Sequence, residues 1–164
     1  MLKTLVPVEE YLARDYSPDV DYVDGTLEDR HVGEKDHSKL QFRIQLLLSA
    51  IAGIHIFPEV RIKVAPTRFR VPDAAVYYEE PDELVFTAPP SLVIEILSPE
   101  DRMSRMMVRV QDYLNMGVEN LWLIDPAQRE TYTCNPSGMH KVTGAIETQD
   151  RKISLSLDAV FDRL

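Results

Sequence analysis

The sequence predicts an α/β (α+β) fold in which a mixed central β-sheet is flanked by helices. Helical and β-type patterns alternate along the chain, and the two runs 91–97 and 120–125 are almost continuously apolar, as in strands covered on both faces. The chain has 164 residues, of which 45% are hydrophobic and 27% charged. This composition fits one domain over residues 1–164, with a core at 36–134 and an N-terminal extension at 1–30.

The N-terminal extension is expected to hold a short helix and then a hairpin at Asp24-Gly25, a dipeptide suited to positive φ. A long helix follows, because one apolar face recurs at helical spacing. Its members are Leu40, Ile44, Leu47, Leu48 and Ile51. We expect Asp36 or Ser38 to cap its start and Gly53 to mark its end.

Two β-type runs, 54–64 and 70–78, lie on either side of Ala65-Pro66-Thr67 and predict a hairpin. After the apolar strand 91–97, a second helix is amphipathic: Met103, Met107, Val110, Leu114 and Gly117 fall on one face. The apolar strand 120–125 ends at Pro126, and 130–134 is its expected hairpin partner. A short strand near 152–155 and a helical turn from Asp158 complete the predicted order.

The formal net charge is −9, from 27 acidic and 18 basic residues. This charge argues against a protein that binds nucleic acid over its whole surface, because such binding needs Lys and Arg at phosphates. A local site stays open, since residues 37–70 hold six basic groups and one acidic group. A single cysteine and no apolar run long enough for a membrane span predict a cytoplasmic protein.

Two carboxylates stand out. Asp73 follows Pro72 in the second β-type run, and Glu95 interrupts the apolar strand 91–97. Adjacent strands would let the two side chains converge. A carboxylate buried among apolar neighbours is costly unless it is paired, and a divalent cation is one suitable partner. An arginine in a structural ion pair with Glu95 is the alternative.

An ordered set of motifs runs through the middle of the chain. It consists of Pro72-Asp73, Glu95-Ile96-Leu97-Ser98-Pro99, Arg109, Tyr113-Leu114-Asn115-Met116-Gly117-Val118 and Trp122-Leu123-Ile124-Asp125-Pro126. This set resembles the Uma family of restriction endonucleases, a branch of the PD-(D/E)XK nuclease superfamily. The resemblance covers roughly residues 25–134. It implies a restriction-endonuclease-like fold and a Mg²⁺-dependent endonuclease that hydrolyses phosphodiester bonds of DNA.

The resemblance also implies roles for single residues. Asp73 and Glu95 would hold Mg²⁺ or Mn²⁺. The superfamily lysine would stand at Leu97, and the displaced lysine of the Uma branch corresponds to Arg109, which would stabilise charge on the phosphate. His37 matches a histidine of the family and would assist catalysis by contacting a metal-bound water or phosphate near the start of its helix; a helix-capping role is the alternative. The remaining candidates are Glu34 and Glu59 as additional metal or water ligands, and Arg102 and Arg105 as phosphate-binding residues.

The resemblance further suggests a homodimer, so that both strands of DNA are reached. The replaced lysine leaves a second hypothesis. Because Leu97 and Arg109 stand where the family pattern has lysine, the chain is alternatively a catalytically weak or inactive nuclease-fold protein that binds nucleic acid or a protein partner.

Overall fold

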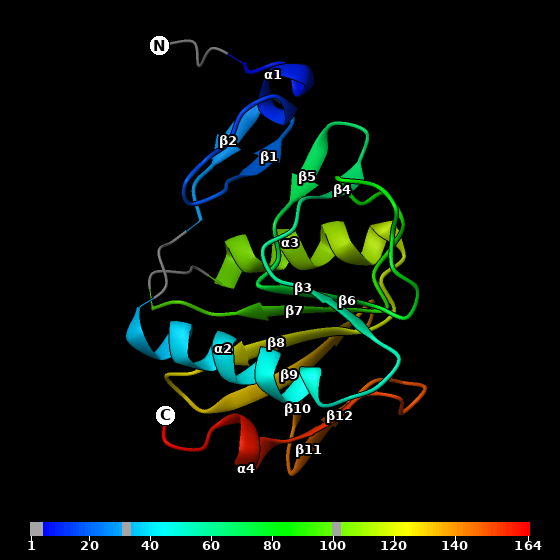
Figure 1. Cartoon of the computed structure of the whole chain (residues 1–164). Helices are drawn as coiled ribbons and strands as arrows, with labels where there is room; N and C mark the ends of the chain where they lie inside the picture. Colours follow the sequence, from blue (N-terminus) through cyan, green and yellow to red (C-terminus); the bar gives the residue numbers. More distant parts are fainter. Residues whose placement is uncertain (1–4, 31–33, 100–102) are drawn as a thin grey trace.

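A computed structural model describes residues 5–30, 34–99 and 103–164 of the chain (Figure 1). Its helices are α1 (Val8–Leu12), α2 (Lys35–Ser49), α3 (Met103–Met116) and α4 (Leu157–Val160). Its strands are β1 (Asp21–Val23), β2 (Thr26–Glu28), β3 (His55–Phe57), β4 (Ile62–Ala65), β5 (Arg68–Arg70), β6 (Ala74–Tyr77), β7 (Leu92–Ile96), β8 (Leu121–Asp125), β9 (Glu130–Asn135), β10 (Gly138–Val142), β11 (Ala145–Glu147) and β12 (Ser154–Ser156).

The central sheet has six strands in the order β10-β9-β8-β7-β6-β3. β7 and β8 are parallel and are connected through α3, whereas the other neighbours in this sheet are antiparallel. Every residue of β7 is buried, which agrees with the continuous apolar run that predicted a central strand. The predicted mixed sheet is therefore confirmed.

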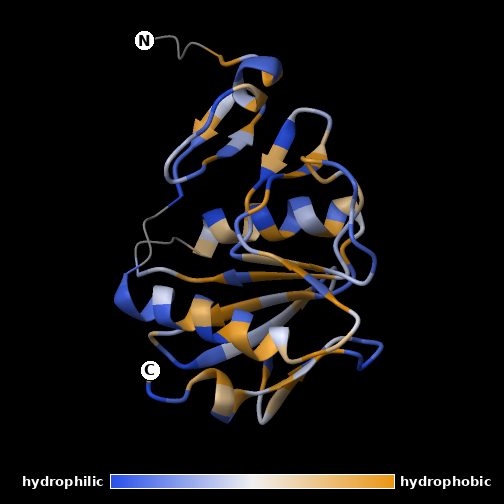
Figure 2. Cartoon of the chain, in the orientation of Figure 1, coloured by the Kyte–Doolittle hydropathy of each residue, from blue (hydrophilic) through white to orange (hydrophobic). Residues whose placement is uncertain are grey.

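Helices cover both faces of this sheet (Figure 1). On one face α2, α4 and the β11–β12 hairpin enclose a core that includes Leu40, Ile44 and Trp122. On the other face α3 packs over the sheet through Met106 and Tyr113. Figure 2 shows hydrophobic residues concentrated along the central strands between these helices. Burial of these apolar side chains is the main force that holds the layers together.

A smaller antiparallel sheet has the order β2-β1-β5-β4 and lies beside α3 (Figure 1). It corrects the prediction that 54–64 and 70–78 are two long strands. Each run is split: β4 and β5 form the hairpin around Pro66, while β3 and β6 pair in the central sheet. The breaks have a local cause, because Glu59 has a φ of 52° and Pro72 has no backbone N–H for a ladder.

The ends of α2 also differ from the prediction. Glu34 is the N-cap residue and makes no side-chain cap bond, while Asp36 lies inside the first turn. The helix ends at Ser49, four residues before Gly53, whose φ is 76°. The first hairpin is confirmed, and Asp24 and Gly25 adopt φ values of 48° and 88° in its turn.

The buried face of α3 is rotated from the predicted one. Met103 is 42% exposed, whereas Met106 and Tyr113 are buried. Asp112, which the apolar pattern did not include, is also buried and paired with arginines. No helix within the described part of the chain is long and apolar enough to cross a membrane.

Candidate active site

Asp73 and Glu95 lie on neighbouring strands of the central sheet. Asp73 directly precedes β6, Glu95 is in β7, and the antiparallel register pairs Ala74 with Ile94. Asp73 therefore lies across from Glu95, as the sequence predicted. Both residues are buried, with exposed fractions of 3% and 0%. Two carboxylates are thus held together at one end of β7.

Asp73 is surrounded by groups that favour its charged form. Its Oδ2 accepts a hydrogen bond from the backbone N–H of Ile96 at 2.7 Å. Its Oδ1 lies 3.0 Å from Nη2 of Arg30 and 3.4 Å from Nε2 of His37. Burial alone would raise the pKa of Asp73, but His37, Arg30 and the Ile96 N–H together lower it. Asp73 is therefore a carboxylate at neutral pH.

Glu95 has two unlike oxygens. Oε1 accepts a hydrogen bond from the hydroxyl of Tyr113 at 2.7 Å and lies 2.9 Å from Nη2 of Arg109. Oε2 is buried and has no hydrogen-bond partner among the described residues. Burial raises the pKa of Glu95 to about 7. The positive charge of Arg109 lowers this pKa, and the negative charge of Asp73 raises it. The ion pair considered from the sequence exists, but it satisfies only one oxygen.

Arg109 projects from α3 into this carboxylate cluster. Besides the contact with Glu95, its Nη2 donates to the carbonyl oxygen of Val71 at 3.1 Å. Its Nε lies 3.4 Å from Oδ2 of Asp21. Only 12% of the side chain is exposed, so the cation is fixed beside Glu95 rather than on the surface.

His37 and Glu59 lie near Asp73, and Glu34 does not contact it. His37 is buried in the first turn of α2. Glu59 is largely exposed, and its Oε1 lies 3.6 Å from Nη1 of Arg30 and 3.5 Å from Nε2 of Gln41. Glu34 is exposed, and within the described ranges no interaction joins its carboxylate to Asp73 or Glu95.

The two proposed phosphate-binding arginines have different outcomes. Arg102 lies outside the described residues. Arg105 is exposed on α3 and borders a small hollow beside the carboxylates. The other residues around this hollow are Asp21, Glu28, Asp29, Arg30, Met106 and Arg109.

A buried ion-pair network was not predicted from the sequence. Arg70 is 1% exposed, and its guanidinium contacts Asp21 on β1 at 2.9 Å and Asp112 on α3 at 2.7 Å. Asp21 also contacts Arg109, so the network connects the small sheet to the candidate active site. Arg30 was missed as well, because no periodic pattern or motif marks the loop after β2.

Comparison with known proteins adds to this geometry. The family model Uma2, described as "Putative restriction endonuclease", matches residues 8–161. The chain belongs to this family. The resemblance inferred from the ordered motifs is therefore confirmed, and it extends further along the chain than the motifs themselves.

A solved structure supports the fold of this Uma2 chain. It is described as "Crystal structure of a putative nuclease belonging to DUF820 from Anabaena variabilis". It superimposes on this chain with a TM-score of 0.82, and the two sequences are 19% identical. The match covers 95% of this chain and 97% of that chain. The predicted fold class is thereby confirmed. No curated protein matches the chain.

The carboxylates of this Uma2 chain fit a hard divalent cation. Mg²⁺ prefers oxygen ligands and is commonly held by one or two carboxylates, with waters and substrate phosphate completing its shell. Asp73 offers an ionised carboxylate, and Oε2 of Glu95 is a buried acceptor without a partner among the described residues. Within the described ranges no group of three or more His, Cys, Asp or Glu could cage a metal. The two carboxylates therefore supply oxygen ligands of the kind that Mg²⁺ prefers.

The raised pKa of Glu95 predicts a pH dependence of stability. The folded chain binds the Glu95 proton more tightly than the unfolded chain, whose pKa is near 4.5, so this contribution is present below pH 4.5 and lost as pH rises through 7. In metal-free protein the free energy of unfolding should fall by about 3 kcal/mol across this window, relative to Glu95→Gln. Urea denaturation at several pH values measures the difference; parallel curves for the two proteins would contradict it.

Proposed function

We propose that the protein is a metal-dependent endonuclease that hydrolyses phosphodiester bonds of DNA. The observation that carries the proposal is the pair of buried carboxylates on adjacent strands. Asp73 is held in its ionised form, and Oε2 of Glu95 has no hydrogen-bond partner among the described residues. Asp73 and Glu95 would hold Mg²⁺ or Mn²⁺. Such an ion, when bound, lowers the pKa of a bound water and polarises a phosphoryl oxygen.

The other candidate side chains would act on the substrate phosphate, on the carboxylates or on the metal ion. Arg109 keeps its proton at any working pH, so it is a source of positive charge for the phosphate and not a general base. His37, at 3.4 Å from Asp73, would assist by orienting that carboxylate. Arg102 and Arg105 would bind neighbouring phosphates, and Glu59 and Glu34 would serve as additional ligands of metal or water.

We also infer that residues 1–164 work as one domain. β1 pairs with β5, and Asp21 of β1 contacts Arg109, which supports an N-terminal segment that completes the site. A homodimer would bring two such sites to opposite DNA strands. The free, buried Cys134 is compatible with the reducing cytoplasm as the working compartment.

The test is cleavage of supercoiled plasmid and of circular single-stranded DNA. We expect nicking or linearisation with Mg²⁺ or Mn²⁺ and none with EDTA. Metal binding should also release up to about one proton near pH 6.5, because the ion requires the charged form of Glu95. Calorimetry in two buffers of different ionisation enthalpy measures this release. Cutting that is unchanged by EDTA would overturn the proposal.

A second candidate is a nuclease-fold protein that binds nucleic acid or a protein partner with little or no catalysis. The observation that favours it is that each carboxylate already has a guanidinium partner, Arg30 on Asp73 and Arg109 on Glu95. These contacts compete with a metal ion for the same oxygens. Absence of any binding heat at millimolar Mg²⁺ or Mn²⁺, together with retained DNA binding, would favour this candidate.

A further inference from the structure

A groove lies between α2 and the C-terminal segment, at an edge of the core that Leu47 and Leu164 partly cover. Its volume is about 550 Å³, and its lining consists of Lys39, Phe42, Arg43, Leu46, Leu47, Ala159, Asp162, Arg163 and Leu164. Phe42 and Leu46, one helical turn apart, are 68% and 57% exposed. An aromatic ring this exposed on a helix offers a flat apolar face to a ligand.

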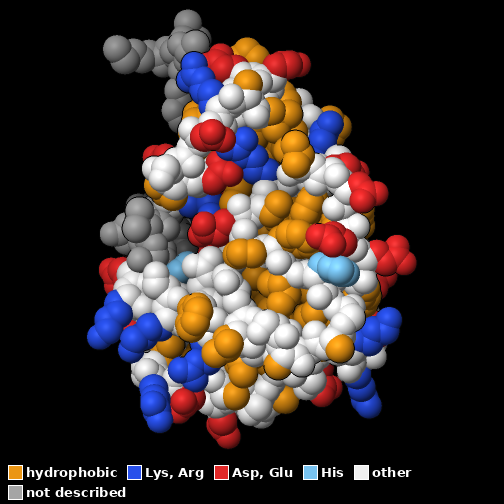
Figure 3. Space-filling view, viewed as in Figure 1, with side chains coloured by type: hydrophobic (Ala, Val, Ile, Leu, Met, Phe, Trp, Pro, Cys, Tyr) orange, Lys and Arg blue, Asp and Glu red, His pale blue; other side chains and the backbone are white. Residues whose placement is uncertain are grey.

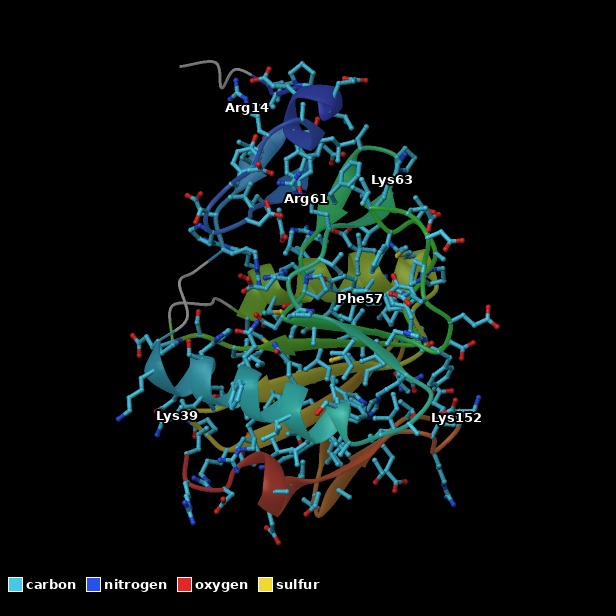
Figure 4. The ribbon with its side chains drawn as sticks, viewed as in Figure 1. Arg14, Lys39, Phe57, Arg61, Lys63 and Lys152 are labelled. Carbon is cyan, nitrogen blue, oxygen red and sulfur yellow. The ribbon has the colours of Figure 1, made fainter. Side chains whose placement is uncertain are left out.

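Basic side chains border this groove. Arg43 and Arg163 both contact the single acidic lining side chain, Asp162, at 3.2 and 3.8 Å. Lys39 makes no ion pair or hydrogen bond within the described ranges. Figure 3 shows Lys and Arg side chains gathered at the lower left, and Figure 4 shows Lys39 pointing outward from α2 on that side. In a chain of net charge −9, such a surface suits an anionic ligand.

We propose that this groove binds a single-stranded segment of nucleic acid. The inference rests on the proposed function, whose substrate it narrows. Single-strand binding surfaces combine cations for the backbone with aromatic rings on which bases stack. Lys39 and Arg43 supply the cations, and Phe42 between them supplies the ring. In a duplex the bases are already stacked in pairs, so Phe42 cannot engage them without unstacking.

The groove and the candidate active site share α2 but lie on different faces of this helix. His37, which contacts Asp73, lies on the same helix five residues before Phe42. At a rise of 1.5 Å per residue the two are separated by about 8 Å along the helix axis. At about 100° per residue their side chains also point about 140° apart, so a strand held at Phe42 would have to pass around α2 to reach the carboxylates.

A second copy of the chain is the rival occupant. The loop 79–84 carries four acidic residues, and its Leu84 is 97% exposed. An acidic, apolar loop is also complementary to a basic, apolar groove. The nucleic acid is favoured because the lining combines an exposed aromatic ring with three basic side chains against one acidic one. The two occupants give different results below.

The variant Phe42→Trp tests the proposal by fluorescence in EDTA. The one native tryptophan, Trp122, is 1% exposed, so the new indole reports on the groove. A 12-nucleotide oligo(dT) should quench it, and a duplex of equal length should bind at least about tenfold more weakly. With two phosphate contacts, from Lys39 and Arg43, affinity should fall about sevenfold between 50 and 200 mM salt. Adding Lys39→Gln to the Phe42→Trp variant removes one phosphate contact. The slope of log affinity against log salt concentration should then be smaller by about 0.7.

Leu84→Trp is the matched control, because it places an exposed indole away from the groove and should not be quenched. Absence of quenching in Phe42→Trp, or equal quenching by duplex, would overturn the proposal. So would light scattering that shows a native dimer which both Phe42→Ala and Leu84→Asp convert to monomer, since that result assigns the groove to the second copy. Binding without cleavage would sink only the proposed function; metal-dependent cleavage without quenching would sink only this inference.

Discussion

Asp73→Asn is expected to lower the rate of metal-dependent DNA cleavage by at least about 10³-fold. The substitution removes one of two carboxylates proposed to hold the ion, and it removes the charge that Arg30 and His37 now contact. Charge stabilisation by a bound metal ion contributes several kcal/mol to the transition state, and about 4 kcal/mol corresponds to 10³ in rate. Single-turnover cleavage of plasmid with Mg²⁺ or Mn²⁺ measures the loss.

A folding defect must be separated from this effect. The Oδ1 of asparagine can still accept the hydrogen bond that Asp73 takes from the Ile96 N–H, so the variant should keep the native circular dichroism spectrum. Asp82→Asn in the loop 79–84 is the matched control and should leave the rate unchanged. A folded Asp73→Asn protein that retains more than a tenth of the native rate would remove Asp73 from the proposed metal site.

The two carboxylates could be predicted from the sequence because their signal is local. A glutamate inside an almost continuous apolar strand must find a partner, and the order of Asp73, Glu95 and Arg109 carries the family pattern. Arg30 carries no such signal. Its contact with Asp73 joins positions 43 residues apart and depends on the path of the loop after β2, which no periodicity specifies.

The fold, too, was predicted where the sequence signal is local and missed where it is not. β7 and β8 were predicted because strands buried on both faces are apolar throughout. The split of 54–64 and 70–78 between two sheets was not, because a proline can end a strand without indicating which sheet the next strand joins. Arg70 was not assigned to the interior either, since an arginine in an alternating run normally faces solvent. The small sheet packs beside α3, and Arg70 is buried between the two.

Arg70→Met is expected to lower the free energy of unfolding by about 3–5 kcal/mol. Methionine approximates the length of the arginine stem, but it removes the buried cation that Asp21 and Asp112 share. Asp21 keeps only the longer contact with Arg109 at 3.4 Å, and Asp112 keeps only the partly exposed Arg68. Burial opposes the charged form of Arg70, yet Asp21 and Asp112 hold its pKa above the ordinary value, which shows how strongly the pairs favour the cation. Urea denaturation at pH 7 measures the loss.

Arg14→Met is the matched control, because Arg14 pairs with Glu10 on the surface and its side chain is 61% exposed. Such a pair contributes at most about 1 kcal/mol. If the buried network is responsible, the double variant Arg70→Met with Asp112→Asn should lose less than the sum of the single losses, with a coupling of about 0.5–3 kcal/mol. Equal losses for Arg70→Met and Arg14→Met would show that the network adds little. A large coupling would mean that Arg70 and Asp112 join the small sheet to α3, the helix that also carries Arg109.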